Sequence, residues 1–181
     1  MTVYNRFDIN MLEVDPISSI GDYSKYDLGN PLLSTSAPSL ELQECLREIY
    51  LLTQIIVEDN VDFGFETNAE KFIRYNLASK GEHYIVALLN KIFMDNFRNL
   101  HIVSVILYII SHMNYTSIYP YGQTMVLAAL NLGDPEIQEY CIRCFELWEN
   151  PDGVRILEGL DIKQSWLRSY RDEVICDLKK R

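Results

Sequence analysis

The stretch LNLGDPEIQEYCIRCFELWENPDG, residues 130–153, contains two places at which a helix is expected to begin. Gly133 suits the end of one helix, because glycine adopts the left-handed backbone conformation without steric cost. Asp134 is expected to cap the next helix, with Pro135 at the first helical position, where its missing N–H leaves no hydrogen bond unmade. Asn150-Pro151 repeats this pattern. The stretch therefore predicts helices that follow one another through tight turns.

The same stretch carries an apolar stripe at helical spacing, which predicts the inward face of the helix that starts at Asp134. The stripe consists of Ile137, Tyr140, Cys141, Cys144, Phe145 and Trp148. The opposite face is expected to carry Glu136, Glu139, Arg143, Glu146 and Glu149. Since both cysteines belong to the stripe, we expect buried thiols. A redox CxxC pair normally opens a helix after a strand, and a zinc site needs further ligands, so neither site is predicted.

Outward from this stretch, apolar periodicity and start signals predict helices along most of the chain. Ser39 is a candidate N-cap, Thr67 and Glu70 form a capping box, and Asp161 with Gln164 suggests another. The predicted helices run from Leu40 to about Val57, Asn68 to about Ser79, His83 to about Phe93, Asn99 to Met113, Gln123 to Leu132, Asp134 to Trp148, Pro151 to about Leu160, and Asp161 to Leu178.

Two of these helices give specific expectations about their faces. In the first helix, Leu42, Cys45, Leu46, Ile49, Thr53 and Ile56 are expected inside, and Glu41, Glu44, Arg47 and Glu48 outside. In the last helix, Trp166, Leu167, Tyr170, Val174 and Leu178 are expected inside.

Residues 1–38 lack a sustained period and predict an irregular N-terminal arm, so we expect a single helical domain over residues 39–181. A chain of 181 residues is long enough to bury a core without disulfides or metal ions. The fold class is therefore predicted to be all-α.

Asn99 to Gly133 contains no Asp, Glu, Lys or Arg, but its apolar part, LHIVSVILYIISHM, is shorter than the roughly twenty residues of a membrane span. We expect a buried core helix there and no membrane association. The N-terminus lacks the apolar run of a signal peptide, so a cytoplasmic protein with reduced cysteines is expected.

The net charge of -10 argues against nonspecific nucleic-acid binding, which needs clustered Lys and Arg, and favours a basic protein partner. Glycine-rich phosphate loops are absent, and the three histidines match no catalytic or metal-binding motif. We therefore expect no cofactor, no metal and no catalytic residues.

Three groups of residues are candidates for contacts with a partner. The first is the acidic turn with Glu58, Asp59, Asp62 and Glu66, which cannot form an EF-hand because Val61 and Phe63 would occupy ligand positions. A solvated turn is the alternative for this group. The second is the predicted loop with Tyr115, Tyr119 and Tyr121, for which packing and interface roles are equally open. The third is the acidic face with Glu136, Glu139, Glu146 and Glu149.

The run TMVLAALNLGDPEIQEYCIRCFELW resembles a HEAT repeat, in which two helices flank a short turn around Asp-Pro. The matching positions are Ala128, Leu130, Asp134, Pro135, Ile137, Cys141 and Leu147. The resemblance covers about one repeat. It implies an α-solenoid, with an irregular helical bundle as the alternative, and such stacks mostly present binding surfaces.

These observations predict a non-catalytic acidic protein-binding module, with its oligomeric state left open. In size and charge the chain is similar to bacterial immunity proteins, which implies neutralisation of a basic toxin such as a nuclease. A scaffold or adaptor, a helical enzyme and a DNA-repair solenoid remain alternatives.

Overall fold

The computed structural model describes residues 39–61 and 65–181, and every regular element in these two ranges is a helix. The predicted all-α class is confirmed for this part of the chain. The predicted arm over residues 1–38 lies outside the described residues. The helices are α1 (Leu40–Glu58), α2 (Asn68–Lys80), α3 (Glu82–Asp95), α4 (Leu100–Ser111), α5 (Tyr115–Ile118), α6 (Tyr121–Leu130), α7 (Pro135–Trp148), α8 (Gly153–Glu158) and α9 (Ser165–Leu178).

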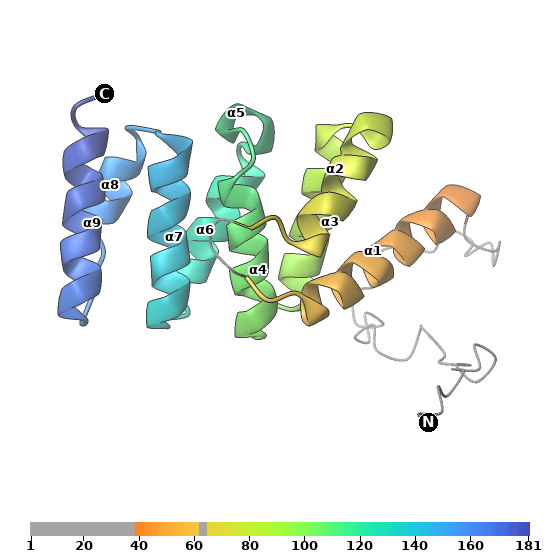
Figure 1. Ribbon diagram of the computed structural model, residues 1–181, viewed down its shortest axis with the longest axis horizontal. Coiled ribbons are helices and arrows are strands. Elements are labelled where there is room, and N and C mark those ends of the chain that lie inside the picture. The colour runs from red at the N-terminus through yellow and green to blue at the C-terminus, as the bar shows by residue number, and fades with distance from the viewer. Residues whose placement is uncertain (1–38, 62–64) are drawn as a thin grey trace, which may run out of the picture. The chain divides into compact units, whose positions relative to one another are not determined.

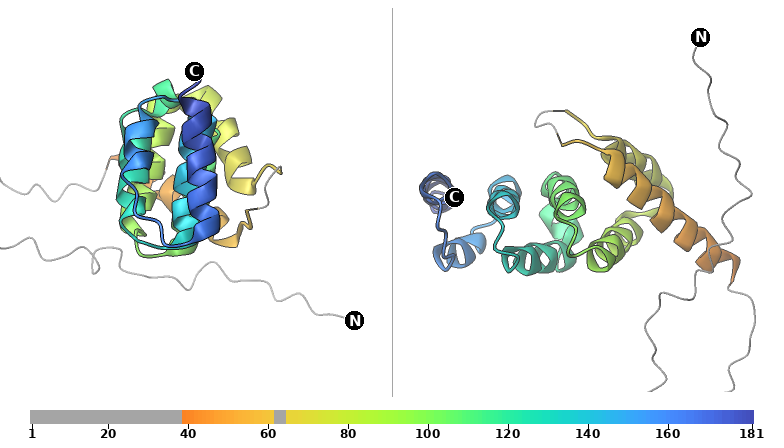
Figure 2. Two further views of the ribbon diagram at one scale, coloured as in Figure 1. Left: turned by 90° about the vertical axis from the view of Figure 1, so that its left-hand side faces the viewer. Right: turned by 90° about the horizontal axis from the view of Figure 1, so that it is seen from below.

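The helices from α3 onward lie in two layers (Figures 1 and 2). One layer contains α4, α7 and α9, and α7 packs against both of its neighbours. The second layer contains α3, α6 and α8, each of which contacts the next long helix of the first layer. At one end, α1 packs against α2, α3 and α4, and at the other end α9 packs against α7 and α8. The core therefore lies between the layers, with α4 and α7 at its centre.

Helix α4 supplies much of that core. All ten residues from Ile102 to Ser111 are buried, as the uncharged sequence predicts. Their apolar side chains would each contribute on the order of 1.5 to 3 kcal/mol of transfer free energy. Among the described helices, none has the length and apolar character that a membrane crossing requires.

The turn between α6 and α7 has the predicted capping geometry. Gly133 adopts a left-handed φ of 69°. The Asp134 carboxylate accepts hydrogen bonds from the backbone N–H groups of Glu136, at 3.0 Å, and Ile137, at 3.1 Å. Pro135 is the first residue of α7. These contacts satisfy N–H groups that have no partner inside the helix, which fixes the point at which α7 begins.

The predicted capping box of α2 is also present. The Thr67 N–H donates to the Glu70 carboxylate at 2.8 Å, and the Glu70 N–H donates to the Thr67 hydroxyl at 3.1 Å. Both start signals depend on residues within one turn of each other, so they were readable in the sequence.

The predicted faces of α1 are partly wrong. Leu42 and Leu46 are exposed, Leu46 by 51%, although helical spacing placed them inside. Glu48 was expected outside, but its carboxylate accepts hydrogen bonds from the Lys80 ammonium and the Tyr84 hydroxyl. The reason is position: α1 lies at one end of the described helices, where only one side of it meets α2, α3 and α4.

The last two predicted starts also need correction. Helix α9 begins at Ser165 after Gln164, and no side chain caps it, so the expected Asp161–Gln164 box is absent. Trp166 was expected inside but is 52% exposed. Helix α8 begins at Gly153 rather than Pro151, because Asn150 accepts a hydrogen bond from the Asp152 N–H at 3.0 Å and closes a turn first.

Candidate protein-binding surface

Cys141 and Cys144 are free, fully buried thiols, as predicted. The Cys144 thiol donates to the Leu107 carbonyl at 3.3 Å, and the Cys141 thiol donates to the Val126 carbonyl at 3.6 Å. Burial raises the pKa of both thiols, because a thiolate would lose its hydration. Within the described ranges, no group of three or more His, Cys, Asp and Glu side chains is placed to hold a metal ion.

Two of the three histidines, His101 and His112, make structural contacts between helices. The His101 ring lies 3.2 Å from the Ile56 carbonyl and so links α4 to α1. The Nδ1 atom of His112 lies 2.9 Å from the Glu70 carboxylate and links the end of α4 to α2. Neither ring is paired with a nucleophile in these contacts.

The acidic turn contains one residue with a clear structural role. The Asp59 carboxylate is buried and accepts hydrogen bonds from the backbone N–H groups of Asn68, at 3.2 Å, and Ala69, at 2.7 Å. It therefore acts as a second cap for α2, and we leave it out of the candidate surface. Glu58 and Glu66 are exposed. Asp62, the fourth candidate in this turn, lies outside the described residues.

The three candidate tyrosines lie at α5 and the start of α6, where the sequence predicted a loop. Tyr115 is half-buried, its ring centroid lies 5.4 Å from that of Trp148, and its hydroxyl donates to Gln123 at 2.9 Å. Burial raises the Tyr115 pKa. Tyr119 and Tyr121 are 58% and 49% exposed. The structure therefore assigns Tyr115 to packing and leaves the other two rings at the surface.

The four candidate glutamates of α7 have different environments. Glu136 is exposed near the start of the helix and lines a small pocket with His101. Glu139 is half-buried and forms an ion pair with Arg143 at 3.0 Å. Glu146 and Glu149 are exposed near the C-terminal end.

Helix α7 separates the candidate residues into two groups. Glu136 lies at its N-terminal end, in a pocket with His101. Glu58 is grouped with it, because His101 also contacts the carbonyl of Ile56 near the end of α1. The tyrosines, Glu146 and Glu149 belong to the other end, where Tyr115 packs on Trp148. The 14 residues of α7 span about 20 Å at 1.5 Å per residue.

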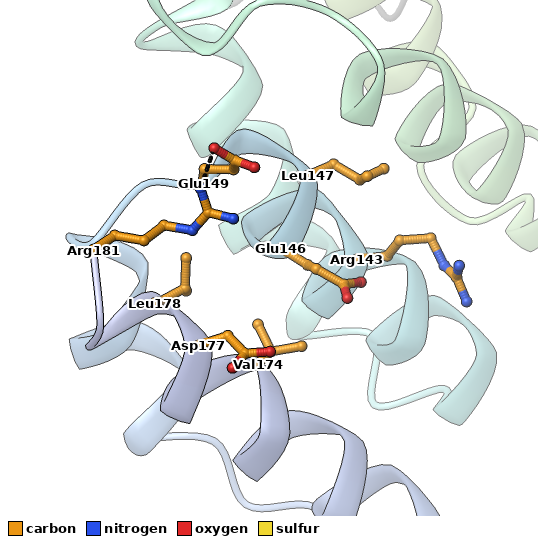
Figure 3. A pocket seen from close by; sticks show the side chains of 8 residues that line it. All are labelled: Arg143, Glu146, Leu147, Glu149, Val174, Asp177, Leu178 and Arg181. Atoms are coloured by element: carbon orange, nitrogen blue, oxygen red, sulfur yellow. Dashed lines mark hydrogen bonds and ion pairs between the residues drawn. The ribbon is translucent and has the colours of Figure 1, made fainter.

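A groove of about 440 Å³ lies between α7 and α9 at this same end (Figure 3). The buried side chains of Val174 and Leu178 form its apolar part, and Leu147 is exposed beside them. Its other lining residues are charged: Arg143, Glu146, Glu149, Asp177 and Arg181. Helix α5 lies on one side of the C-terminal end of α7, and α9, which forms the other wall of the groove, lies on the opposite side (Figure 1).

Contacts across the groove are mostly exposed and therefore weak. Glu149 and Arg181 form an ion pair, drawn in Figure 3, with both side chains about half exposed. The Tyr170 hydroxyl donates to Glu146, and burial together with this carboxylate raises the pKa of Tyr170. Hydrogen bonding to Lys180 lowers the pKa of Asp177.

Sequence reasoning missed the α9 wall of the groove, namely Asp177 and Arg181. The spacing of Val174 and Leu178 indicated the inward face of α9 but not which helix it would meet. Leu147 matched the HEAT pattern and gave no separate sign that it would be exposed. None of the groove's eight lining residues is Ser, Thr, Cys or His, and its carboxylates are those of Glu146, Glu149 and Asp177.

No protein-family model, curated protein or solved structure matches the chain. The function therefore has to be argued from the residues and their arrangement.

Proposed function

We propose that the chain is a non-catalytic acidic module that binds a basic protein. The observation that supports this most is the placement of Tyr119 and Tyr121, both exposed, at the same end of α7 as the exposed carboxylates of Glu146 and Glu149. Tyrosine is enriched among residues that dominate binding energy, because it offers a large rigid surface with few rotatable bonds.

The charges suit a cationic partner. The whole chain carries a net charge of -10, and carboxylates of the groove lie beside an apolar floor. A Lys or Arg side chain of a partner would place its aliphatic stem on Leu178 and its charge near Glu146 or Asp177. Opposite potentials would also speed encounter, most strongly at low salt.

We further propose that the described helices form a HEAT-like solenoid. The support is that α3–α4, α6–α7 and α8–α9 are successive contacting pairs, whose members lie in opposite layers. The Asp134-Pro135 turn joins the central pair in the way that the sequence resemblance implies. Such stacks commonly present extended surfaces to partners.

An immunity protein is the more specific form of this proposal, supported by the mass of 21.1 kDa and the acidic charge. It would inhibit its basic partner, whereas a scaffold or adaptor would bind without inhibition. An activity assay of the captured partner with and without the chain separates the two roles.

The test is affinity capture with the full chain as bait, followed by mass spectrometry. We compare wild type with the Tyr119→Ala/Tyr121→Ala double variant and with Tyr75→Ala, a control that removes an exposed tyrosine from α2. We expect a basic protein to be enriched by wild type and by the control, and to be reduced about tenfold or more with the double variant, as for residues that each contribute about 1 kcal/mol or more. A partner retained equally by all three baits, or an acidic partner, contradicts the proposal.

A further inference from the structure

Arg181 lies in the α7–α9 groove that we propose as part of the protein-binding surface. Its guanidinium pairs with the Glu149 carboxylate of α7, and Figure 3 shows the two side chains reaching toward each other. Because Arg181 follows α9, whose last residue is Leu178, this ion pair joins the two walls of the groove. The groove thus already holds one cationic side chain, which belongs to the chain itself.

The residues after α9 hold Arg181 in this position. The Lys179 N–H donates to the Ile175 carbonyl at 3.1 Å, and the Arg181 N–H donates to the Leu178 carbonyl at 3.4 Å. The Lys179 ammonium also donates to the Glu158 carboxylate of α8 at 2.6 Å. The backbone at Arg181 is therefore tied to α9 and α8, and rotation of its side chain is enough to move the guanidinium into or out of the groove.

The other two carboxylates of the groove have partners of a different kind. Glu146 accepts a hydrogen bond from the Tyr170 hydroxyl of α9, which is neutral. Asp177 accepts one from Lys180, which lies three residues further along the same wall. Glu149 is therefore the carboxylate of the groove that is paired with a cation from the opposite wall.

Glu149 also has an unusual backbone conformation. It ends α7 with a φ of 52° and a ψ of 28°, which lies in the left-handed region. Glycine is the usual residue at such a helix end, because a Cβ atom is strained there. An outlier of this kind supports a functional role for the side chain, here the carboxylate that meets Arg181.

We propose that Arg181 is an internal competitor of the cationic side chain that a basic partner places in the groove, so that the free chain keeps its own groove partly closed. This inference rests on the proposed function. A tethered side chain competes at a high effective concentration, because the chain already holds it beside its site. Both side chains of the pair are about half exposed, and exposed ion pairs contribute little stability, so a partner with further contacts displaces Arg181. Removal of Arg181 therefore strengthens binding, and this gain requires Glu149.

The affinity of the full chain for a fluorescein-labelled hexa-arginine peptide tests this proposal. Fluorescence anisotropy measures the dissociation constant at about 0.1 M salt, where fields are screened over about 10 Å. We expect Arg181→Ala to lower the dissociation constant about two- to fivefold, the range that loss of an exposed ion pair allows. Lys163→Ala is the matched control, because it removes one exposed positive charge at the other end of α9. It should change the dissociation constant by less than about 1.5-fold.

A double-mutant cycle then locates the competition. Glu149→Gln should weaken peptide binding, and adding Arg181→Ala to it should change the affinity no more than the control does. A gain from Arg181→Ala that does not exceed that of Lys163→Ala overturns the proposal, as does an equal gain in the Glu149→Gln background. Peptide binding that Glu149→Gln leaves unchanged, or no binding by any variant, also overturns it. The proposed function fails by a different result, namely affinity capture that yields no basic protein dependent on Tyr119 and Tyr121.

Discussion

The two helices at the ends of the described arrangement, α1 and α9, carry different kinds of residues on the sides that they expose to solvent. Apart from Trp166, the exposed positions of α9 carry mostly charged and polar residues: Arg168, Ser169, Asp172, Glu173, Cys176 and Asp177. The exposed positions of α1 include a ridge of Leu42, Leu46 and Tyr50. A polar outer face is what terminates a helical stack in water, whereas an apolar outer face indicates a further contact. The comparison therefore distinguishes a largely polar outer face on α9 from a partly apolar one on α1.

The two ends are also held in different ways. Helix α9 buries Leu167, Val174 and Leu178, which are distributed along its length. Helix α1 buries only Leu52 and Ile56, in its second half. Its first half is tied to α2 and α3 by the hydrogen bonds of Glu48 with Lys80 and Tyr84. Apolar burial thus anchors α9, while polar contacts hold much of α1.

The largest effect is expected in α7, between these two ends. Cys144→Asp would place a carboxylate in a fully buried position, costing about 3 to 5 kcal/mol of unfolding free energy or forcing the group to stay protonated. Denaturant titration should show the loss, with fluorescence of Trp148 in the core and Trp166 on α9 changing together. A stability equal to wild type would contradict burial of this thiol.

Paired substitutions in α1 define where its buried part begins. Leu52→Ala should cost about 2 to 5 kcal/mol, because it leaves a cavity in the core. Leu46→Ala should change the stability of the monomer by less than about 0.5 kcal/mol, since this side chain is exposed. Thermal unfolding of dilute protein measures both. Equal costs would show that the ridge is covered within a single chain.

Replacing the two capping aspartates should lower the free energy of unfolding by different amounts, with the larger loss at the more buried cap. Asp59→Ala is expected to cost about 2 kcal/mol, because the buried carboxylate serves two backbone N–H groups and the side chain of Asn68. Asp134→Ala should cost about 1 kcal/mol, since that cap is less buried. Urea midpoints measure both effects. A larger loss at Asp134 would contradict the buried role of Asp59.

Glu48 gives the α1 end a dependence on pH. Burial opposes ionisation of this carboxyl, but hydrogen bonds from Lys80 and Tyr84 outweigh it and lower the pKa below the ordinary 4.5. The resulting stability is present above pH 4.5 and is lost as the pH falls through the lowered folded-state pKa. Glu48→Gln should therefore cost about 1 kcal/mol at pH 7 and have no effect at strongly acidic pH. A cost that does not change with pH would argue against the ion pair.

The parts of the fold that the sequence predicted are those that local contacts determine. The Thr67–Glu70 box and the Asp134-Pro135 start involve neighbours in the chain, and the stripe of α7 lies in a helix that other helices cover on several sides. The predictions of which side chains are buried failed in α1 and α9, the helices at the two ends of the described arrangement. Leu46 and Trp166 fit an apolar period, but periodicity cannot say whether a further helix covers that face.

The candidate site was predictable in the same limited sense. Tyr119 and Tyr121 were identified from an aromatic segment around a proline, yet nothing in the sequence placed them beside the end of α7. Asp177 and Arg181 were missed because the α7–α9 groove depends on contacts between residues far apart in the chain. The buried role of Asp59 depends likewise on its bonds to residues 68 and 69, on the far side of the acidic turn.

Binding kinetics of the captured partner test protein binding by this surface most directly. Tyr121→Ala should speed dissociation, and Glu146→Lys/Glu149→Lys should slow association, which in wild type should fall as salt screens fields over about 8 to 10 Å. Tyr75→Ala, the exposed control on α2, should change neither rate. A partner whose association and dissociation rates are unaffected by the tyrosine and glutamate changes would contradict the account, as would turnover of a substrate by the isolated chain.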